Sequence, residues 1–478
     1  MKVVFLCGGV GKRMSPLSED KFLLKFLGRP LLEYQIEQAR KAGLNEFILI
    51  GNPSNMERIK AITQNISGGN FAFAVQEKPL GMANALEAAK NILTDEPIIV
   101  INPNDVFEST AYVNIIEEYQ RDSATSYVLA YEVKEYFPGG YLVLSGDRDV
   151  GAIIEKPGKG NEPSNLVNMV VHLHTQPGKL LQYIADTVTS ADDVYEQALS
   201  KMIKEGYKVR AVRYSDFWKA IKYPWDVFSV MEHFLKQIEQ NISPKASISP
   251  TAVIEGDVLI EESVKVLENA VIKALCYIGR NSIIGNNALI RGGSHIGEGC
   301  VIGYGTEIKH CYIGDGCWFH KSFFGDSIVG NDCSFGAGTV TANLRLDERN
   351  ISVKVGKEDI DTGSNKLGAI VGDRVHTGIN VSLMPGIRVG AGGFIGPHVC
   401  LTQDLPEGKM ALGAQNYRIT DNTLSCHSEP SSLSSLRGAV PCQVREGDRR
   451  DSLSATKQSG GRDEINTPSA SNDTRGER

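Results

Sequence analysis

The chain has 478 residues, a length that predicts at least two domains, each with a core of its own. Its composition, 41% hydrophobic and 22% charged, is typical of a globular protein in water. The formal net charge of -7 argues against nucleic acid or an acidic membrane surface as the main partner. No apolar run approaches membrane-spanning length, and the first strand begins at Lys2, so we expect a cytoplasmic protein without a signal peptide.

A short apolar strand opens the chain and runs directly into a glycine-rich turn. The strand, residues 2–7, is rich in β-branched and aromatic side chains. The turn contains Gly8, Gly9 and Gly11, and the cations in or near it are Lys12, Arg13 and Lys21. Glycines let several backbone N–H groups converge on an anion, and the cations could neutralise a polyphosphate. The stretch therefore predicts a phosphate-binding loop.

Helical and strand-like segments alternate from residue 31 to residue 240. Helices are expected at 32–42, 84–93, 179–184, 193–205 and 225–240, and strands at 46–50, 97–101, 126–132, 141–144, 151–154 and 166–172. The alternation predicts an α/β, Rossmann-like domain over residues 1–240, with a mostly parallel sheet and helices on both faces. Ligands bind such sheets at the carboxyl ends of the strands, where the glycine-rich turn lies.

A six-residue repeat occupies residues 241–415. β-branched aliphatic residues fall at every sixth position: Ile248, Ile254, Ile260, Val266, Ile272, Ile278, Ile284, Ile290, Ile296, Ile302 and Ile308. The repeat slips at Ile313, resumes at Ile328, breaks at 345–365 and returns from Val371 to Leu401. A strict period of six predicts a parallel β-helix, because it fits neither a helix face nor an ordinary strand. Residues 416–478 are rich in Ser, Arg, Gly and Asp, so we expect a disordered tail without a function.

Two polar segments of the first domain could carry chemistry. Gln76 and Gly81 stand just before a helix and could read the flat edge of a pyrimidine, although a loop and helix start would look the same. Asp105 follows the buried strand at 97–101. Proteins usually hold Mg²⁺ through one or two carboxylates and the substrate's own oxygens, so Asp105 is the candidate metal ligand. An aspartate after a strand is otherwise commonly a helix cap.

These segments resemble the signature of the sugar-1-phosphate nucleotidyltransferases. Residues 8–24 resemble the motif G-x-G-x-R followed by P-K-x-L, and residues 76–85 resemble the base-reading motif Q-x-x-P-L-G-T-A. The metal position of the family falls on Asp105, its E-K-P segment on Glu155 and Lys156, and its following asparagine on Asn168, residues that in the family contact sugar and phosphate. The resemblance implies that Arg13 holds the leaving phosphates, Lys21 the α-phosphate and Asp105 a Mg²⁺ ion.

The chain departs from that signature in three segments. Asp20 stands where the family usually has proline, and Met82 replaces a threonine. The family commonly closes with W-x-D-I-G-T-P, whose aspartate is the second metal ligand, but here Ala220 occupies that position. Either Asp105 with water suffices, or a neighbour such as Asp216 or Asp226 substitutes, or the domain binds a nucleotide sugar without turning it over efficiently.

Two further segments lie where the repeat is interrupted, around His320 and Asn343. Histidine has a pKa suited to removing a proton from an amine that attacks a thioester, and an asparagine could position the group. A histidine on a β-helix is otherwise more often structural.

The repeat resembles the left-handed β-helix of the hexapeptide-repeat acyltransferases. The segments around His320 and Asn343 resemble the acetyltransferase domain of the bifunctional N-acetylglucosamine-1-phosphate uridyltransferase family and its archaeal relatives. The catalytic base of that family falls on His320 of this chain, and the partner of that base falls on Asn343. The phosphate-binding positions fall on Arg291 and Lys309, and a matching lysine on Lys366. Phe323 and Ser334 differ from the tyrosine and asparagine at the bacterial sugar-binding positions. The resemblance implies acetyl-CoA as a co-substrate and a homotrimer.

The sequence therefore predicts an enzyme that forms a nucleotide sugar and pyrophosphate from UTP or dTTP and a sugar 1-phosphate. Its second domain is expected to acetylate an amino sugar phosphate. Two alternatives stay open: a nucleotide-sugar-binding trimeric scaffold with a weak or inactive first site, and a nucleotidyltransferase without acetyltransferase activity.

Overall fold

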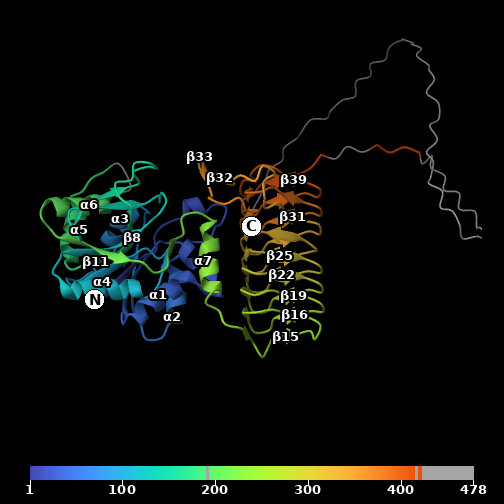
Figure 1. Ribbon diagram of the computed structural model, residues 1–478, viewed down its shortest axis with the longest axis horizontal. Coiled ribbons are helices and arrows are strands. Elements are labelled where there is room, and N and C mark those ends of the chain that lie inside the picture. The colour runs from blue at the N-terminus through green and yellow to red at the C-terminus, as the bar shows by residue number, and fades with distance from the viewer. Residues whose placement is uncertain (190–192, 415–417, 422–478) are drawn as a thin grey trace, which may run out of the picture. The chain divides into compact units, whose positions relative to one another are not determined.

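The computed structural model describes residues 1–189, 193–414 and 418–421 (Figure 1). Its first half is built on a nine-stranded sheet in the order β10-β9-β11-β6-β1-β4-β5, with β8 beside β11 and β12 beside β8. The strands are β1 Lys2–Leu6, β4 Glu46–Gly51, β5 Asn70–Val75, β6 Ile98–Ile101, β8 Ser126–Glu132, β9 Gly140–Leu144, β10 Val150–Glu155, β11 Leu166–His174 and β12 Val209–Tyr214. The predicted α/β domain is confirmed, although the sequence did not indicate β5 or β12.

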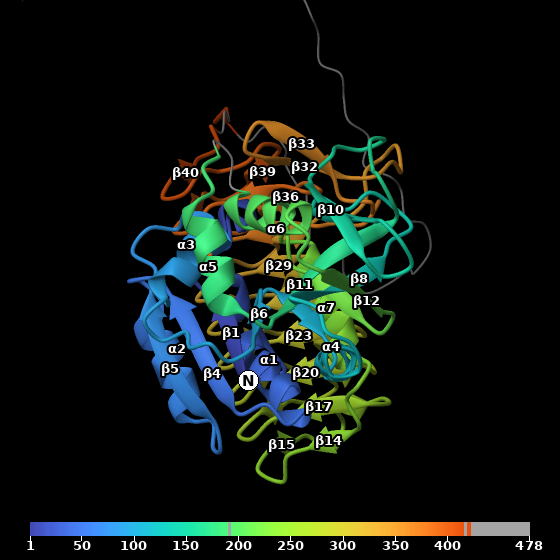
Figure 2. The same ribbon diagram turned by 90° about the vertical axis from the view of Figure 1, so that its left-hand side faces the viewer.

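Helices cover both faces of this sheet, as predicted (Figure 2). They are α1 Leu31–Lys41, α2 Met56–Gln64, α3 Gly81–Ala88, α4 Thr110–Arg121, α5 Pro177–Ala185 and α6 Val194–Lys204. Alternate side chains of β1 point to opposite faces, so Val3 and Phe5 pack in a core with α1, α2 and α4. Val4 packs in a second core with α3, α5 and α6.

The expectation of a mostly parallel sheet is wrong for one half of it. Strands β6, β1, β4 and β5 are parallel, but β11 runs antiparallel to β6, β8 and β9. No helix lies between β8 and β11 in the chain. Parallel neighbours need a long crossover, so the short connections here reverse the chain instead.

Two short antiparallel pairs complete the first half. One joins β2 (Lys25–Phe26) to β3 (Arg29–Pro30), and the other joins β7 (Asp105–Phe107) to β13 (Trp218–Ala220). Two 3₁₀ turns, η1 (Lys12–Met14) and η2 (Lys21–Leu23), follow the glycine-rich turn. The helix expected at 225–240 is shorter: α7 spans Asp226–Leu235.

The predicted β-helix is confirmed, and its coils are stacked in Figure 1. Its first sheet contains β14 Asn241–Ile242, β17 Val258–Ile260, β20 Cys276–Ile278, β23 Ser294–Ile296, β26 Tyr312–Ile313, β29 Ile328–Val329, β34 Ile370–Val371 and β37 Arg388–Val389. The second contains β15 Ser247–Ile248, β18 Lys265–Val266, β21 Ile283–Ile284, β24 Val301–Ile302, β27 Trp318–Phe319, β30 Ser334–Phe335, β35 His376–Thr377, β38 Phe394–Ile395 and β40 Met410–Ala411. The third contains β16 Val253–Ile254, β19 Val271–Ile272, β22 Leu289–Arg291, β25 Glu307–Lys309, β28 Phe323–Gly325, β31 Val340–Thr341, β36 Ser382–Leu383 and β39 Cys400–Leu401.

One inward position of the repeat differs from the prediction. Val329, not Ile328, packs inside the β-helix, because Val329 is the residue in register with Ile313. Ile328 pairs with Tyr312 and faces outward. The break at 345–365 is confirmed as a β-hairpin of β32 (Ser352–Val355) and β33 (Glu358–Asp361).

The β-helix and α7 share a third core with the start of the chain. Tyr312 and Ile328 of the β-helix pack in it with Phe26 of β2 and Phe234 of α7. The ring centroids of Phe26 and Tyr312 are 5.6 Å apart, and the Tyr312 hydroxyl donates to the carbonyl of Lys25 at 2.9 Å. The two predicted domains are therefore packed together within residues 1–414.

Two other expectations concern the rest of the chain. The tail predicted for 416–478 lies outside the described residues, apart from 418–421. Among the helices that the structure describes, none is both long enough and apolar enough to cross a membrane.

Candidate functional site

The glycine-rich turn leaves β1 at the carboxyl edge of the sheet and contacts Gln76. A Cβ atom at Gly8 would overlap the side-chain amide of Gln76, so this close approach requires glycine. Gln76 is buried, and its Nε2 donates to the carbonyl of Gly81 and to Asn84 Oδ1, at 3.0 Å each. The predicted base-reading segment is thus fixed beside the predicted phosphate loop.

A first cavity at this edge of the sheet is strongly cationic. Its lining includes Gly8, Gly9, Gly11, Gln76 and Gly81, four cationic side chains, Lys12, Arg13, Lys21 and Lys222, and one carboxylate among the described residues, Asp105. The Lys21 ammonium donates to the carbonyl of Ile221 at 2.8 Å. Burial, together with the neighbouring charges of Lys222 and Arg13, lowers the pKa of Lys21 to about 8. This surplus of positive charge suits a polyphosphate.

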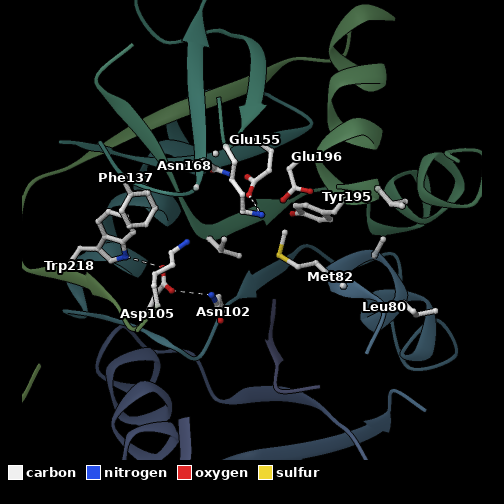
Figure 3. Close-up of a pocket in the computed structure, with 18 residues that line it drawn as sticks. Leu80, Met82, Asn102, Asp105, Phe137, Glu155, Asn168, Tyr195, Glu196 and Trp218 are labelled. Atoms are coloured by element: carbon white, nitrogen blue, oxygen red, sulfur yellow. Dashed lines mark hydrogen bonds and ion pairs between the residues drawn. The ribbon is translucent and has the colours of Figure 1, made fainter. Parts of the chain in front are cut away.

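Asp105 begins β7 and is held on both carboxylate oxygens (Figure 3). Oδ2 accepts a hydrogen bond from the Trp218 indole Nε1 at 3.0 Å, and Oδ1 accepts one from Asn102 Nδ2 at 3.1 Å. Burial raises the pKa of Asp105, whereas Lys222, Trp218 and Lys21 lower it. The carboxylate is therefore fixed in place at the floor of the cavity rather than free in solvent.

A second cavity adjoins the first, and the two share five lining residues, Gly81, Met82, Asn102, Asp105 and Lys222. It contains the three residues that the resemblance assigned to the sugar, Glu155, Lys156 and Asn168, of which Glu155 and Asn168 are labelled in Figure 3. Glu155 Oε1 and the Lys156 ammonium form an ion pair at 2.9 Å. Lys156 has a φ of 45°, a backbone conformation that residues other than glycine adopt rarely. Residues far apart in the sequence thus meet around Asp105.

A buried hydrogen-bond chain behind Asn168 was not indicated by the sequence. It runs through Ser126, His174, Tyr195 and His172 to Asn168, with bonds of 2.7–2.8 Å. Burial lowers the pKa of His172 to about 3 and lowers that of His174, so both rings are neutral. Because Asn168 Oδ1 can only accept, His172 Nε2 donates to it and His172 Nδ1 accepts from the Tyr195 hydroxyl.

The direction of this chain follows from those two bonds. The Tyr195 oxygen accepts from His174 Nε2, and His174 Nδ1 accepts from the Ser126 hydroxyl. The amide oxygen of Asn168 is therefore turned toward His172. This leaves the Asn168 NH₂ group as the donor on the cavity side.

The oxygen atoms beside Asp105 could act as ligands of a magnesium ion that a single carboxylate holds. Asn104 Oδ1 is buried, lies in a residue that lines the first cavity, and has no hydrogen-bond partner among the described residues. Mg²⁺ prefers such hard oxygen ligands and keeps several waters or substrate oxygens. The described residues contain no cluster of three or more His, Cys, Asp or Glu side chains that could hold a metal without substrate.

Neither aspartate considered as a replacement second ligand lines these cavities. Asp216 is exposed and accepts a hydrogen bond from the Thr110 hydroxyl at 2.5 Å. Asp226 Oδ2 accepts from the backbone N–H groups of Lys222 and Tyr223, at 2.8 Å each, and its Oδ1 pairs with Lys219 at 2.8 Å. Both carboxylates are thus engaged elsewhere.

In the β-helix, four predicted residues gather at the corner that follows the third sheet. Arg291 and Lys309 end β22 and β25 and are paired in register. Lys309 Nζ and Asn343 Nδ2 both donate to Asp326 Oδ2, at 3.1 and 2.5 Å. The backbone of Lys366 bridges to Leu344, next to Asn343. Asp326, which the sequence did not single out, organises this corner.

His320 lies at a different corner of the same β-helix. It follows β27 of the second sheet and is exposed, whereas Asn343 follows β31 at the far end of the third sheet. Strand β28 spans the side between the two corners. A single chain therefore presents the predicted base and its predicted partner at opposite ends of one face.

Comparisons with known proteins find two families along the chain, one for each half. Residues 2–237 match the nucleotidyl transferase family, and residues 275–310 match the bacterial transferase hexapeptide (six repeats). The chain is 36% identical over 424 residues to the bifunctional protein GlmU of Methanococcus maripaludis, covering 88% of this chain and 99% of that protein. It is 32% identical over 423 residues to a bifunctional sugar-1-phosphate nucleotidylyltransferase/acetyltransferase of Sulfurisphaera tokodaii, covering 86% and 99%. A solved UDP-glucose pyrophosphorylase from Acinetobacter baumanii is 20% identical, with a TM-score of 0.43, over 49% of this chain and 94% of that one.

Proposed function

Because the chain belongs to the family of bifunctional sugar-1-phosphate nucleotidylyltransferase/acetyltransferases, we propose that it forms a nucleotide sugar at its first site and acetylates an amino sugar phosphate at its second. One observation supports the first reaction most: the phosphate-loop cavity and the sugar-side cavity share Asp105. A nucleotide in one and a sugar 1-phosphate in the other bring their reacting phosphates to the same carboxylate.

The residues of the first site then have distinct roles. The turn at Gly8, Gly9 and Gly11 holds the triphosphate of UTP or dTTP, and Gln76 and Gly81 face its base. Glu155, Lys156 and Asn168 hold the sugar 1-phosphate, whose oxygen attacks the α-phosphate in line with the departing pyrophosphate. Arg13 binds the leaving phosphates and Lys21 the α-phosphate.

Asp105, with Asn104 beside it, would hold Mg²⁺. The bound ion would offset negative charge on the α-phosphate. Lys21 and Arg13 add fixed positive charge at the same place, in a site that burial partly screens from water.

For the second reaction we propose that His320 is the general base that deprotonates the amino sugar, with acetyl-CoA as the acyl donor. Arg291, Lys309 and Lys366 would bind the sugar phosphate, and Asn343 would position the acceptor. Because His320 and this cluster lie at different corners of one chain, a complete site needs a second copy of the chain. A cyclic homotrimer meets that need, since it brings one corner of each chain against the other corner of its neighbour.

A panel of nucleoside triphosphates and sugar 1-phosphates, with pyrophosphate release as the readout, tests the first reaction. Release with UTP or dTTP supports it, and binding of nucleotide sugar without release for any pair would favour a scaffold. Thiol release from acetyl-CoA with glucosamine 1-phosphate and related amino sugar phosphates tests the second. Pyrophosphate release without thiol release would leave a nucleotidyltransferase alone.

A further inference from the structure

The pairing of β7 with β13 fixes what faces the candidate metal ligand. Ala220 is directly opposite Asp105 in this antiparallel pair, and its side chain is buried. A methyl group therefore occupies the place where the motif W-x-D-I-G-T-P carries a second carboxylate. Neither Asp216 nor Asp226 compensates, because both are bonded elsewhere.

Lys222 stands two residues after Ala220, at the glycine of that motif, and lines both cavities. Its ammonium donates to the carbonyl of Pro138 at 3.1 Å and lies 4.5 Å from the centroid of the Phe137 ring. The backbone N–H of Lys222 is bonded to Asp226 at the start of α7. Both the backbone and the ammonium of Lys222 are thus held, at a point where the two cavities adjoin.

Lys222 lines both cavities, so its ammonium lies where substrate phosphates would meet. Burial lowers the pKa of Lys222, Asp105 and Glu155 oppose this effect, and Arg13 and Lys156 add to it. No carboxylate lies within ion-pair distance of its ammonium in the described residues. No single carboxylate of the described residues therefore neutralises the positive charge of Lys222.

We propose that Lys222 is a further catalytic residue, whose ammonium binds the phosphate oxygens that meet at Asp105. This inference rests on the proposed nucleotidyl transfer. Relative to the motif, the loss of a carboxylate at 220 and the gain of an ammonium at 222 both make the site more positive. In the motif, positive charge comes from a metal ion held between two carboxylates. Here an ammonium fixed to the chain would supply that charge.

Metal-free binding of a nucleotide sugar separates this role from a structural one. Calorimetric titration of UDP-N-acetylglucosamine in EDTA should give an affinity for the wild type within about tenfold of that in Mg²⁺. The Lys222→Met variant should bind at least about tenfold more weakly in EDTA, as expected for the loss of a charged hydrogen bond. Lys222→Arg, which keeps the charge, should stay close to the wild type. Lys204→Met, the same change at an exposed residue of α6, is the matched control.

The possible results distinguish the two proposals. Two results would overturn the role of Lys222 even if pyrophosphate release is normal. One is that the wild type no longer binds in EDTA, and the other is that the wild type and Lys222→Met bind equally well without metal. Absence of both binding and pyrophosphate release in Mg²⁺ would instead contradict the proposed nucleotidyl transfer.

A double variant provides a second test that does not depend on the stability of Lys222→Met. Ala220→Asp with Lys222→Gly restores the motif's pair of residues. Its affinity for UDP-N-acetylglucosamine should fall in EDTA and recover as Mg²⁺ is added. A metal dependence identical to that of the wild type would contradict the inference.

Discussion

Asn168 Oδ1 accepts a hydrogen bond from His172 Nε2 at 2.8 Å, in a part of the sheet where both side chains are buried. Because His172 is neutral, this bond and the one to Tyr195 fix which way the Asn168 amide is turned. The proposed sugar-binding donor is thus oriented by two buried side chains, His172 and Tyr195, of which Tyr195 also lines the second cavity.

Replacing Tyr195 by phenylalanine should disturb that orientation. The change leaves His172 Nδ1 and His174 Nε2 without their shared partner, at a cost of about 1–3 kcal/mol in the free energy of unfolding. We expect a severalfold higher KM for the sugar 1-phosphate and an unchanged KM for the nucleotide. Steady-state kinetics measures both constants. Tyr183→Phe, at a half-buried tyrosine of α5 whose hydroxyl donates to Glu205, is the control, and an equal effect on both KM values would contradict the orienting role.

Replacing Asp105 by asparagine should abolish nucleotide-sugar formation. Asparagine keeps an oxygen for the Trp218 indole but removes the negative charge that would hold the metal ion. The rate should fall by more than about tenfold, a barrier change of about 1.4 kcal/mol, with an unchanged circular dichroism spectrum. Asp216→Ala should leave the rate unchanged, because that carboxylate is exposed and bonded to Thr110. Retention of a tenth or more of the activity by Asp105→Asn would refute the metal assignment.

The rate of the first reaction should fall as pH rises through about 8. The pKa of Lys21 is lowered to about 8, and only its protonated form carries the charge for the α-phosphate. Lys222 is a neighbouring positive charge that lowers this pKa, so Lys222→Met should move the fall in kcat/KM to higher pH. Lys204→Met should leave the profile in place. A shift to lower pH in Lys222→Met would contradict the electrostatic account.

Mixing two inactive variants should restore acetyl transfer. His320→Ala and Asn343→Ala should each lose about a hundredfold or more of the rate, and His376→Ala, an exposed histidine on β35, should not. In a cyclic trimer built from both variants, one of the three interfaces pairs an intact His320 corner with an intact Asn343 corner. Co-expressed, doubly tagged trimers should therefore regain about a third of the wild-type rate. Inactive mixed trimers, or a monomeric mass by light scattering, would argue against a shared site.

The sequence predicted the features that depend on residues close together in the chain. The six-residue period indicated the β-helix because each inward side chain recurs at a fixed spacing, and the strand-glycine pattern indicated the phosphate loop. The slip at Ile313 could not be resolved in this way, since shortening a coil changes which of two adjacent aliphatic residues, Ile328 or Val329, faces inward.

Other features depend on tertiary packing. Tyr195 lies on α6, more than 20 residues from both histidines that it joins on β11, so their chain exists only after the helix packs on the sheet. Asp20 does not match the phosphate-loop motif, so the sequence indicated no role for it. In the structure, Asp20 Oδ2 accepts a hydrogen bond from Asn55 Nδ2 at 2.8 Å. Asn55 Nδ2 also donates to the carbonyl of Cys7 at 3.0 Å. A carboxylate at this position thereby braces the end of β1.

The core that Phe26 and Phe234 share with Tyr312 makes each half of the chain depend on the other for its stability. A fragment ending at residue 240 would expose the aromatic rings that Tyr312 and Ile328 now cover, and a fragment beginning at 241 would expose the other side of the same contact. Exposed apolar patches of this kind promote aggregation. A substitution that loosens this contact should therefore lower the stability of both halves of the chain together.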